Sequence, residues 1–494
     1  MVHPLDDPTF LLGPVLYFRG EQGDRWRLSA LFVLEGDAEP DDLRVDGVSL
    51  PVPPRHVGAW RGRHVWRFDF AVPRGREDGD AGYGFPDGPR WSVTVPGRHR
   101  RPRIAFVTGS GTDDETAWDT KDGDNGEGRS HLWRGLMDSH AAAPFHLLLH
   151  GGGQIHADSV WRDCAHLARW QKGNDPQRLS RPFTAAMAEE VMDFYFSHYV
   201  ALWSRRDMAA AFARIPSLMI WDDHDIFSGW GSLGDGVQAA PVNRGVFMVA
   251  RHTAAMFQMA AATDAMPELA WGTDMGTFTQ GVRMGDVGLF APDLRSERSS
   301  TRVFSDRTWR ALPEWLARFN GCRHLLVLSS VPLVFSDITQ VERLMDRLPG
   351  RQGVEEDLRG QWRSQAHAEE WRYLVELLAG FSLRSACRIT VLSGGVGVGA
   401  FGVLHGGGVA IRQVITAGIV HPPLSALTAF GLERLAAREE EPFDGYGLTM
   451  QPFIENGRRL IRSRTWVSLG FDPRATLHAQ WNAEGRPEPF RVSF

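Results

Sequence analysis

One short segment of the chain places three carboxylates around a histidine, directly after an apolar stretch. Residues 215–221 read Ile-Pro-Ser-Leu-Met-Ile-Trp, and Asp222, Asp223, His224 and Asp225 follow at once. Carboxylate oxygens and imidazole nitrogens on one loop are the groups that a divalent cation or a phosphoryl-transfer site requires. The spacing leaves a second interpretation open, in which the segment is a turn with an aspartate helix cap and a solvated histidine.

A second segment carries two arginines that are suited to binding an anion. Arg295 and Arg298 stand at the third and sixth positions of Asp-Leu-Arg-Ser-Glu-Arg, residues 293–298. Guanidinium groups on a loop near strand ends suit phosphate or carboxylate, because their fork of N–H donors can bind two oxygens at once. Ion pairs with Glu297 or Asp293 are the other interpretation of these arginines.

The acidic loop follows one of several short apolar runs that alternate with longer segments of helical spacing. This alternation predicts an α/β sheet with helices on both faces. In open sheets of this kind, ligands bind at the loops that follow the strands, so residues 222–225 stand where a site is expected. The expected strands are residues 104–107, 145–149, 217–221, 325–328 and 389–392, and residues 362–378 have helical spacing.

The first hundred residues show a different pattern, in which alternating or aromatic runs are separated by Gly, Pro and Asp. Period-two segments with turn residues between them predict a small antiparallel sandwich. We therefore expect two units, an N-terminal β-sandwich domain over residues 1–100 and an α/β domain over residues 101–494, joined through the basic segment 97–103. The runs are residues 15–18, 26–34, 65–70 and 91–95, and strand-like runs at 465–471, 476–481 and 490–494 are expected to complete a sheet of the second unit.

The acidic loop also resembles a known family. Trp-Asp-Asp-His-Asp at 221–225, followed by Gly-Trp-Gly-Ser at 229–232, is similar to the metal loop of PhoD-like phosphatases, a branch of the calcineurin-like metallophosphoesterases. The resemblance extends over residues 104–425 and implies a four-layer αββα metallophosphoesterase sandwich with an N-terminal β-domain. The other matching segments are Leu-His-Gly-Gly-Gly-Gln-Ile-His-Ala-Asp at 149–158, Asp-Leu-Arg-Ser-Glu-Arg at 293–298, Ser-Ser-Val-Pro-Leu at 329–333, Ser-Gly-Gly-Val-Gly-Val-Gly-Ala at 393–400 and Ile-Val-His-Pro-Pro at 419–423.

This resemblance implies a hydrolase with two metal ions, such as iron and calcium, bridged by an aspartate. The metals activate a water that attacks a phosphate ester, while histidines and asparagines stabilise the developing charge. If this mechanism applies to the present chain, the resemblance implies catalytic roles for His224, Asp223 and Arg295. The candidate metal ligands are Asp222, Asp223, His224 and His156, the last at the family's tyrosine position. Asp158 and Asp225 also match the family pattern and could bind a metal.

Four positions of the family pattern carry glycine in this chain. Gly153 stands at the bridging aspartate, Gly395 at a later aspartate, Gly397 at the following histidine and Gly109 at the cysteine of the first strand loop. Glycine offers no ligand atom, so we expect either no metal or one weakly bound divalent ion in place of the dinuclear centre. The vacated space and the exposed N–H groups could instead form an anion-binding nest. The expected ligand-binding residues are Gly109, Gly153, Gln154, Gly395, Gly397 and Arg298.

The bulk composition restricts the classes of partner. The net charge is −6 and the isoelectric point is about 6.3, so no overall basic field exists to hold nucleic acid, whereas a small anionic or phosphate-containing ligand remains compatible. No apolar run approaches the length of a membrane span, and the N-terminus does not read as a secretory signal. With three widely spaced cysteines, these features predict a cytoplasmic location. The oligomeric state stays open, a homo-oligomer included.

Two functional hypotheses follow from these residues. In the first, the chain is a degenerate phosphoesterase that binds a ligand or partner, or performs altered chemistry, without the dinuclear centre. In the second, it is an active phosphomonoesterase or phosphodiesterase that uses metal-activated water on a rearranged site. A serine hydrolase is disfavoured, because His-Gly-Gly-Gly at 150–153 has no accompanying Gly-x-Ser-x-Gly elbow. The glycines near residue 395 are a weak match to a dinucleotide loop.

Overall fold

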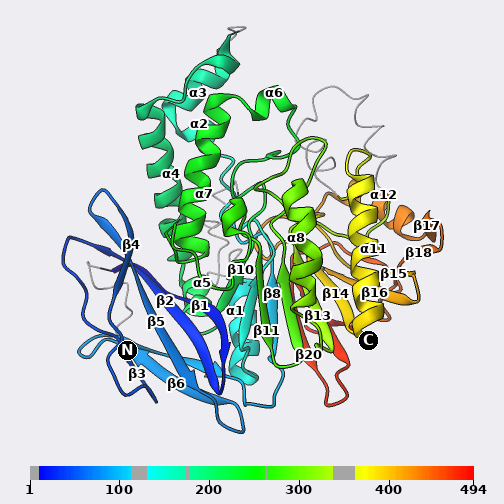
Figure 1. Ribbon diagram of the computed structural model, residues 1–494, viewed down its shortest axis with the longest axis horizontal. Helices are drawn as coiled ribbons and strands as arrows, with labels where there is room; N and C mark the ends of the chain where they lie inside the picture. The colour runs from blue at the N-terminus through cyan, green and yellow to red at the C-terminus, as the bar shows by residue number, and fades with distance from the viewer. Residues whose placement is uncertain (1–9, 113–130, 174–176, 263, 338–361) are drawn as a thin grey trace.

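Two large β-sheets form the centre of the molecule (Figure 1). The computed structural model describes residues 10–112, 131–173, 177–262, 264–337 and 362–494. The first sheet has the strand order β22 (Phe490–Ser493), β21 (Leu477–Ala483), β20 (Thr465–Phe471), β8 (Ile104–Val107), β9 (Leu147–His150), β10 (Ser217–Met219), β1 (Phe10–Gln22), β2 (Arg25–Glu35), β5 (Arg63–Pro73) and β4 (Arg55–Trp60).

The second sheet lies against the first and has a parallel centre. Strands β12, β13, β14 and β16 run parallel to one another, as the buried apolar runs predict. Its order is β11 (Gln280–Met284), β12 (Val287–Ala291), β13 (His324–Ser329), β14 (Arg388–Ser393), β16 (Val409–Ile415), β15 (Gly399–Gly406), β18 (Tyr446–Met450) and β17 (Glu440–Phe443), with β19 (Leu460–Ile461) paired to β15.

Helices cover the outer faces of both sheets. In Figure 1, α4 and α7 stand together to the left of the sheets, and α11 and α12 lie to the right. The helices are α1 (His131–Ala142), α2 (Val160–Asp163), α3 (Ala165–Lys172), α4 (Ala185–Trp203), α5 (Arg206–Phe212), α6 (Asp235–Gln238), α7 (Pro241–Gln258), α8 (Asp306–Ala317), α11 (Ala368–Ser385) and α12 (Ala426–Ala436), with short 3-10 turns at η3 (Arg178–Ser180) and η4 (Thr273–Met275).

The period of two along each strand divides the core into layers. In β9, Leu147 and Leu149 join the apolar cluster between the two sheets, whereas Leu148 joins the cluster beneath the helices of the first sheet. Strand β13 alternates in the same way, with Leu326 facing the other sheet and Leu325 facing α8 and α11. The layers are therefore helix, sheet, sheet and helix, which confirms the expected αββα metallophosphoesterase sandwich.

The N-terminal strands form an antiparallel sandwich whose larger sheet continues into the central one. Strand β1 pairs antiparallel with β2 and, through Tyr17 and Ser217, parallel with β10. A small sheet of β3 (Arg44–Val45), β6 (Gly79–Gly84) and β7 (Arg90–Val95) packs on it, with the ring of Phe32 5.2 Å from that of Phe85 and 5.7 Å from that of Trp91. The domain boundary near residue 100 stays a prediction.

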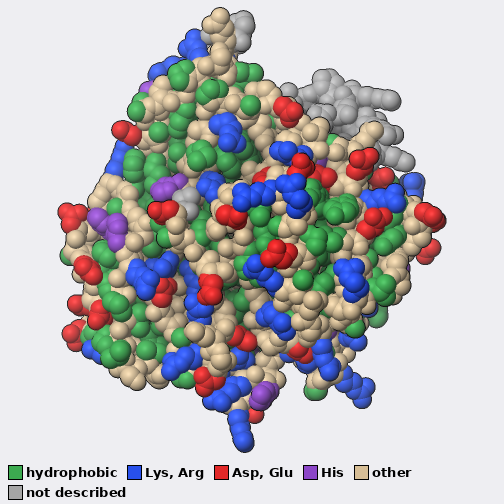
Figure 2. Space-filling model, viewed as in Figure 1, with side chains coloured by type: hydrophobic (Ala, Val, Ile, Leu, Met, Phe, Trp, Pro, Cys, Tyr) green, Lys and Arg blue, Asp and Glu red, His purple; other side chains and the backbone are tan. Residues whose placement is uncertain are grey.

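The C-terminal strands meet one further expectation. Strands β20, β21 and β22 add an antiparallel edge beyond β8, so the last residues do complete a sheet. Among the helices of the described residues, none combines the length and the apolar character that crossing a bilayer requires. Acidic and basic side chains are mixed over the face shown in Figure 2.

Three buried histidines make the stability of this fold depend on pH. Burial lowers the pKa of His140 and of His146 from 6.5 to about 4, and that of His150 to about 3. The unfolded chain therefore takes up protons below pH 6.5 that the folded chain does not. We expect the contribution of these three histidines to the free energy of unfolding to be fully present above pH 6.5 and to fall as the pH is lowered toward 4.

Urea unfolding at several pH values measures this dependence. Each histidine adds up to about 1.4 kcal/mol per pH unit to the slope within this window. His150→Leu should reduce the slope, whereas His405→Gln, at an exposed histidine of β15, should leave it unchanged. An unaltered slope in His150→Leu would contradict the lowered pKa of His150.

Candidate active site at the strand ends

Four loops meet at the carboxyl ends of the parallel strands. Residues 108–112 follow β8, residues 151–159 follow β9 and residues 220–232 follow β10, and these strands run parallel in one sheet. Residues 416–424 join them from β16 of the second sheet. Backbone hydrogen bonds that tie the loops together run from Gly111 N to Gly153 O at 2.9 Å, from Ala157 N to His224 O at 2.6 Å, and from Ile419 N to Thr108 O at 2.8 Å.

Three histidines from three of these loops stack on one another. The imidazole of His156 lies 4.3 Å from that of His224 and 4.5 Å from that of His421, measured between ring centroids, and the second pair is tilted by only 11°. The resemblance to the family marked residues 419–423 as a matching segment, but it gave His421 no role. The structure places this side chain directly against the predicted ligand His156.

Asp158 links two of the histidines and polarises them. Its Oδ2 lies 2.8 Å from His224 Nδ1 and 3.9 Å from His156 Nδ1, while its Oδ1 accepts the N–H of Ser228. Burial opposes protonation of His224, yet the carboxylates of Asp158 and Asp223 raise its pKa well above the ordinary value. Burial, together with His224 and His421, lowers the pKa of His156 well below that value. The pKa values of these two neighbouring histidines are therefore shifted in opposite directions, His224 toward the protonated form and His156 toward the neutral form.

The two adjacent aspartates of the acidic loop differ in their partners. Asp223 Oδ1 forms an ion pair with Arg295 Nη2 at 2.9 Å, and its Oδ2 accepts the N–H of Gly229 at 3.1 Å. Burial acts against ionisation, but Arg295 and His224 outweigh it and lower the pKa of Asp223. Asp222 Oδ1 is buried and has no hydrogen-bond partner among the described residues. Burial and the charge of Asp223 raise the pKa of Asp222 to about 6.

Asp225 fixes the loops rather than facing the histidines. Its Oδ2 accepts the N–H groups of Gly153 at 3.0 Å and Asp222 at 3.1 Å, and its Oδ1 accepts that of Ile155 at 3.1 Å. This carboxylate is fully buried. It therefore holds the turn that carries Asp222 against the turn that carries His156.

Arg295 and Arg298 are both buried beside the acidic loop. Arg295 pairs with Asp223, not with Glu297 or Asp293, and its Nε and Nη1 have no hydrogen-bond partner within the described ranges. Burial and the charge of Arg295 lower the pKa of Arg298 to about 9, and Arg298 Nη2 lies 3.3 Å from Nδ1 of His367. Arg295 therefore does form an ion pair, but its partner is Asp223 and not one of the two carboxylates expected from the sequence.

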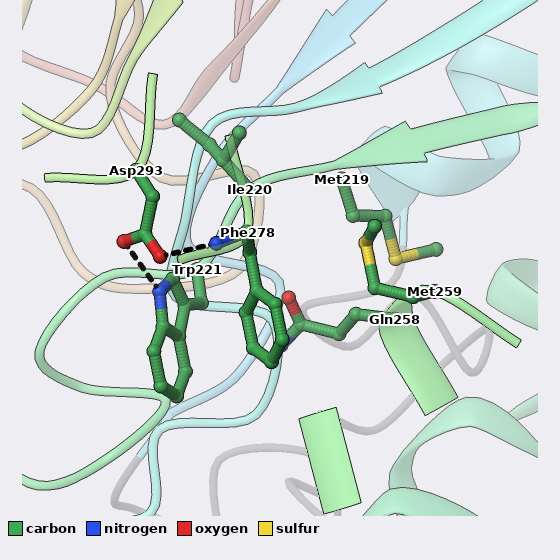
Figure 3. Close-up of a pocket in the computed structure, with 7 residues that line it drawn as sticks. All are labelled: Met219, Ile220, Trp221, Gln258, Met259, Phe278 and Asp293. Carbon is green, nitrogen blue, oxygen red and sulfur yellow. Dashed lines mark hydrogen bonds between the residues drawn. The ribbon is translucent and has the colours of Figure 1, made fainter. Parts of the chain in front are cut away.

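Asp293 anchors the arginine loop to the strand that leads into the acidic loop. It accepts hydrogen bonds from Trp221 Nε1 at 2.9 Å and from Phe278 N at 2.7 Å (Figure 3). It also accepts the N–H of Arg295 at 2.9 Å and that of Ser296 at 3.0 Å. The small cavity in Figure 3 has room for one water at most. This cavity is therefore not the substrate site.

Comparison with known proteins assigns the family. Residues 87–354, more than half of the chain, match the family model described as PhoD related phosphatase. The chain belongs to the PhoD-related phosphatase family. An uncharacterized Saccharomyces cerevisiae protein, YGR266W, is 22% identical in an alignment of 338 residues that covers 56% of this chain and 48% of that relative. The chain thus spans about half the length of the curated relative.

Two solved structures share the fold of this PhoD-related chain. The structure of PhoD superimposes with a TM-score of 0.58 over 99% of this chain and 90% of its own, at 11% identity. Purple acid phosphatase PPD1 from yellow lupin (Lupinus luteus) seeds superimposes with a TM-score of 0.51 over 97% of this chain and 74% of its own, at 10% identity. At these identities the likeness establishes the fold alone.

The four glycines that the family resemblance places at ligand positions all have left-handed backbone conformations. The φ angles are +55° at Gly109, +68° at Gly153, +80° at Gly395 and +61° at Gly397. A Cβ on Gly153 would lie 3.2 Å from Gly109 Cα, and one on Gly395 would lie 2.7 Å from the carbonyl oxygen of Ser330. Glycine offers no ligand atom at any of these four positions, so the residues present do not fit a two-metal clamp there.

The backbone N–H groups of the first two glycines already have hydrogen-bond acceptors within the protein. Gly109 N donates to Gly152 O at 3.0 Å, and Gly153 N donates to Asp225 Oδ2. The side chain of Gln154 is also hydrogen-bonded within the protein, because its Nε2 donates to Ile220 O at 2.6 Å. The ligand-binding roles remain predictions, as do the catalytic roles of Asp223, His224 and Arg295. The predicted ligand-binding residues are Gly109, Gly153, Gln154, Gly395, Gly397 and Arg298.

Proposed function

We propose that this PhoD-related chain works without the dinuclear metal centre and binds a small phosphate-containing ligand, either as a non-catalytic binding protein or as a hydrolase with altered chemistry. The observation that carries this proposal is the set of four left-handed glycines at ligand positions. A metal clamp of about half a dozen ligands loses most of its binding free energy when four are missing.

Positive charge at the strand ends supports an anionic ligand. Asp158 Oδ2 lies 2.8 Å from Nδ1 of His224, whose pKa is raised, and Arg295 keeps Nε and Nη1 without partners among the described residues. A guanidinium with two donor groups left over matches the oxygens of a phosphate group. Membership of a phosphatase family favours phosphate over other small anions.

An active metal-dependent phosphoesterase is the second candidate. It would use Asp222, Asp223, His224 and His156 with a rearranged metal, and a metal-activated water would be the nucleophile. The observation that favours it is the short distance between the donor atoms of His156, Asp158 and His224. The two candidates differ in whether a chelator abolishes turnover.

Two measurements separate these candidates. Calorimetric titration with inorganic phosphate should give saturable binding, and hydrolysis of bis(p-nitrophenyl) phosphate should be absent or unaffected by EDTA. Hydrolysis that EDTA abolishes and added metal restores would replace the first candidate with the second. A protein that neither binds phosphate nor cleaves the diester would exclude both.

Replacing single glycines with aspartate should show how much room the surrounding backbone leaves for a side chain. Gly153→Asp is expected to fold at a cost of about 1–2 kcal/mol, because aspartate enters the left-handed region more readily than most residues. Gly395→Asp should cost more, since its Cβ would lie 2.7 Å from a backbone oxygen of Ser330. Thermal unfolding of both variants measures the difference, and equal stability would contradict the closer contact expected at Gly395. Elemental mass spectrometry of Gly153→Asp then reports any gain of metal.

A further inference from the structure

Helix α12, at the right of Figure 1, presents two large apolar side chains to solvent one turn apart. Leu427 is 81% exposed and Phe430 is 58% exposed. The opposite side of the helix packs on the core through Ala429, Leu432 and Ala436. The helix therefore has two apolar faces, and only one of them is buried.

Two arginines lie on the same side of α12 as these exposed apolar side chains. A helix turns once in about 3.6 residues, so Arg434 follows Leu427 and Phe430 along one face. Its guanidinium lies 4.7 Å from the centre of the Phe430 ring. Arg438 comes one turn later, where its backbone N–H donates to Leu435 O at 3.0 Å, and both arginines are exposed. We call Leu427, Phe430, Arg434 and Arg438 the outer face of α12.

This outer face carries no carboxylate, and α12 lies wholly within the described part of the chain. Glu433, the acidic residue of the helix, accepts the N–H groups of Arg459 at 2.8 Å and Leu460 at 3.0 Å. Glu439 and Glu441 come after the last turn of the helix, at the start of β17. A face with two guanidinium groups and no carboxylate is complementary to a negatively charged surface.

We propose that the outer face of α12 docks on an anionic lipid bilayer. Exposed leucine and phenylalanine beside arginines are typical of helices that bind a membrane interface. The apolar groups enter the headgroup boundary, while the guanidinium groups contact the lipid phosphates. A stable protein interface buries roughly 800 Å² on each partner, far more than two protruding side chains supply. A bilayer needs no complementary shape, so it suits this convex helix surface better.

Docking through α12 would turn the strand-end site toward the bilayer. The loop 416–424, which carries His421, leads directly into the helix at Ser425, whose hydroxyl accepts the N–H of Thr428 at 3.2 Å. Residues 422–432 contain no charged side chain. The helix has 11 residues, about half the length that crosses a bilayer, so the contact is with the membrane surface.

Sedimentation with lipid vesicles tests the proposal. The full chain should bind vesicles of phosphatidylcholine and phosphatidylserine, and it should bind phosphatidylcholine alone at least about fivefold more weakly. Added salt should weaken the binding, because it screens the arginines. Leu427→Ser/Phe430→Ser should lower the partition coefficient by about tenfold, since two apolar side chains no longer enter the interface. Arg434→Gln and Arg438→Gln should each lower it by about fivefold.

An exposed leucine in the N-terminal part of the chain provides the matched control. Leu50 is 75% exposed and lies between β3 and β4, on the other side of the molecule from α12 in Figure 1. Leu50→Ser should leave vesicle binding unchanged. Inorganic phosphate at constant ionic strength should not release the bound protein, because the outer face of α12 is separate from the strand-end site. Circular dichroism and thermal unfolding confirm that each variant is folded.

Several results would overturn the proposal. Among them are no binding to the phosphatidylserine vesicles, unchanged binding in Leu427→Ser/Phe430→Ser, and release by inorganic phosphate, which would assign the lipid contact to the strand ends. Self-association of the full chain in sedimentation equilibrium, abolished in the same double variant, would show that a second copy covers this face instead. Failure to bind inorganic phosphate in calorimetry would contradict the proposed function alone, because vesicle binding through α12 does not depend on it.

Discussion

Replacing Asp293 with alanine is expected to lower the free energy of unfolding by about 3–5 kcal/mol, because it leaves several buried donors without an acceptor. Asp293 is 2% exposed and accepts hydrogen bonds from Trp221 Nε1, Phe278 N, Arg295 N and Ser296 N. The hydrogen bonds from Trp221, Phe278 and Arg295 are buried and that from Ser296 is half-buried, so water cannot replace the lost oxygen fully.

The unfolding temperature should fall by about 3–5 °C, because the entropy of unfolding of a chain of this length is roughly 1 kcal/mol per degree. Asp293→Asn keeps one oxygen but turns an amide toward the remaining donors, so an intermediate loss is expected. Asp37→Ala, at a carboxylate that is 96% exposed, should shift the transition by less than about 0.5 °C. A shift in Asp293→Ala no larger than that of Asp37→Ala would contradict the anchoring role.

Asp293 also illustrates where sequence reasoning stops. The alternation of apolar runs and helical spacing was sufficient to predict the α/β architecture, and the family resemblance added the αββα layers. Strand period and burial are local properties of the chain, so one sequence carries them. The acceptor role of Asp293 depends on Trp221 and Phe278, which lie 72 and 15 residues away, and no spacing pattern records that contact.

The candidate site was predicted in part for the same reason. The loop 222–225 and His156 were identified from residue types, and the structure brings them together. His421 was missed as a neighbour of His156, because it comes from a loop of the other sheet. The continuation of the N-terminal strands into the central sheet was also missed, because the pairing of Tyr17 with Ser217 joins segments 200 residues apart.

The same limit applies to the glycines. Their identity could be read from the sequence, and an open, anion-binding nest was a reasonable expectation of small residues at strand ends. The structure shows that Asp225 and the carbonyl of Gly152 take the N–H groups of Gly153 and Gly109. Whether glycine opens a space or lets the backbone close depends on neighbours that the sequence does not place.

The ion pair of Arg295 and Asp223 gives the second large expected effect. The two side chains are 3% and 10% exposed, and their nearest atoms are 2.9 Å apart. Arg295→Met leaves Asp223 charged and buried beside Asp222, so the free energy of unfolding should fall by about 3–5 kcal/mol. Because the charge left behind causes most of this loss, the double variant Arg295→Met/Asp223→Asn should be less destabilised than the sum of the two single variants.

Phosphate titration of the same three variants links this pair to the proposed function. Arg295→Met should abolish measurable binding, because it removes the guanidinium donors. Asp223→Asn should instead tighten binding, by about tenfold if one nearby negative charge contributes roughly 1.4 kcal/mol of repulsion. A purely structural ion pair would weaken binding in both single variants in proportion to their loss of stability. Weaker phosphate binding in Arg295→Met together with tighter binding in Asp223→Asn would therefore support Arg295 as an anion-binding residue. Equal losses of phosphate affinity would mean that the ion pair only stabilises the fold.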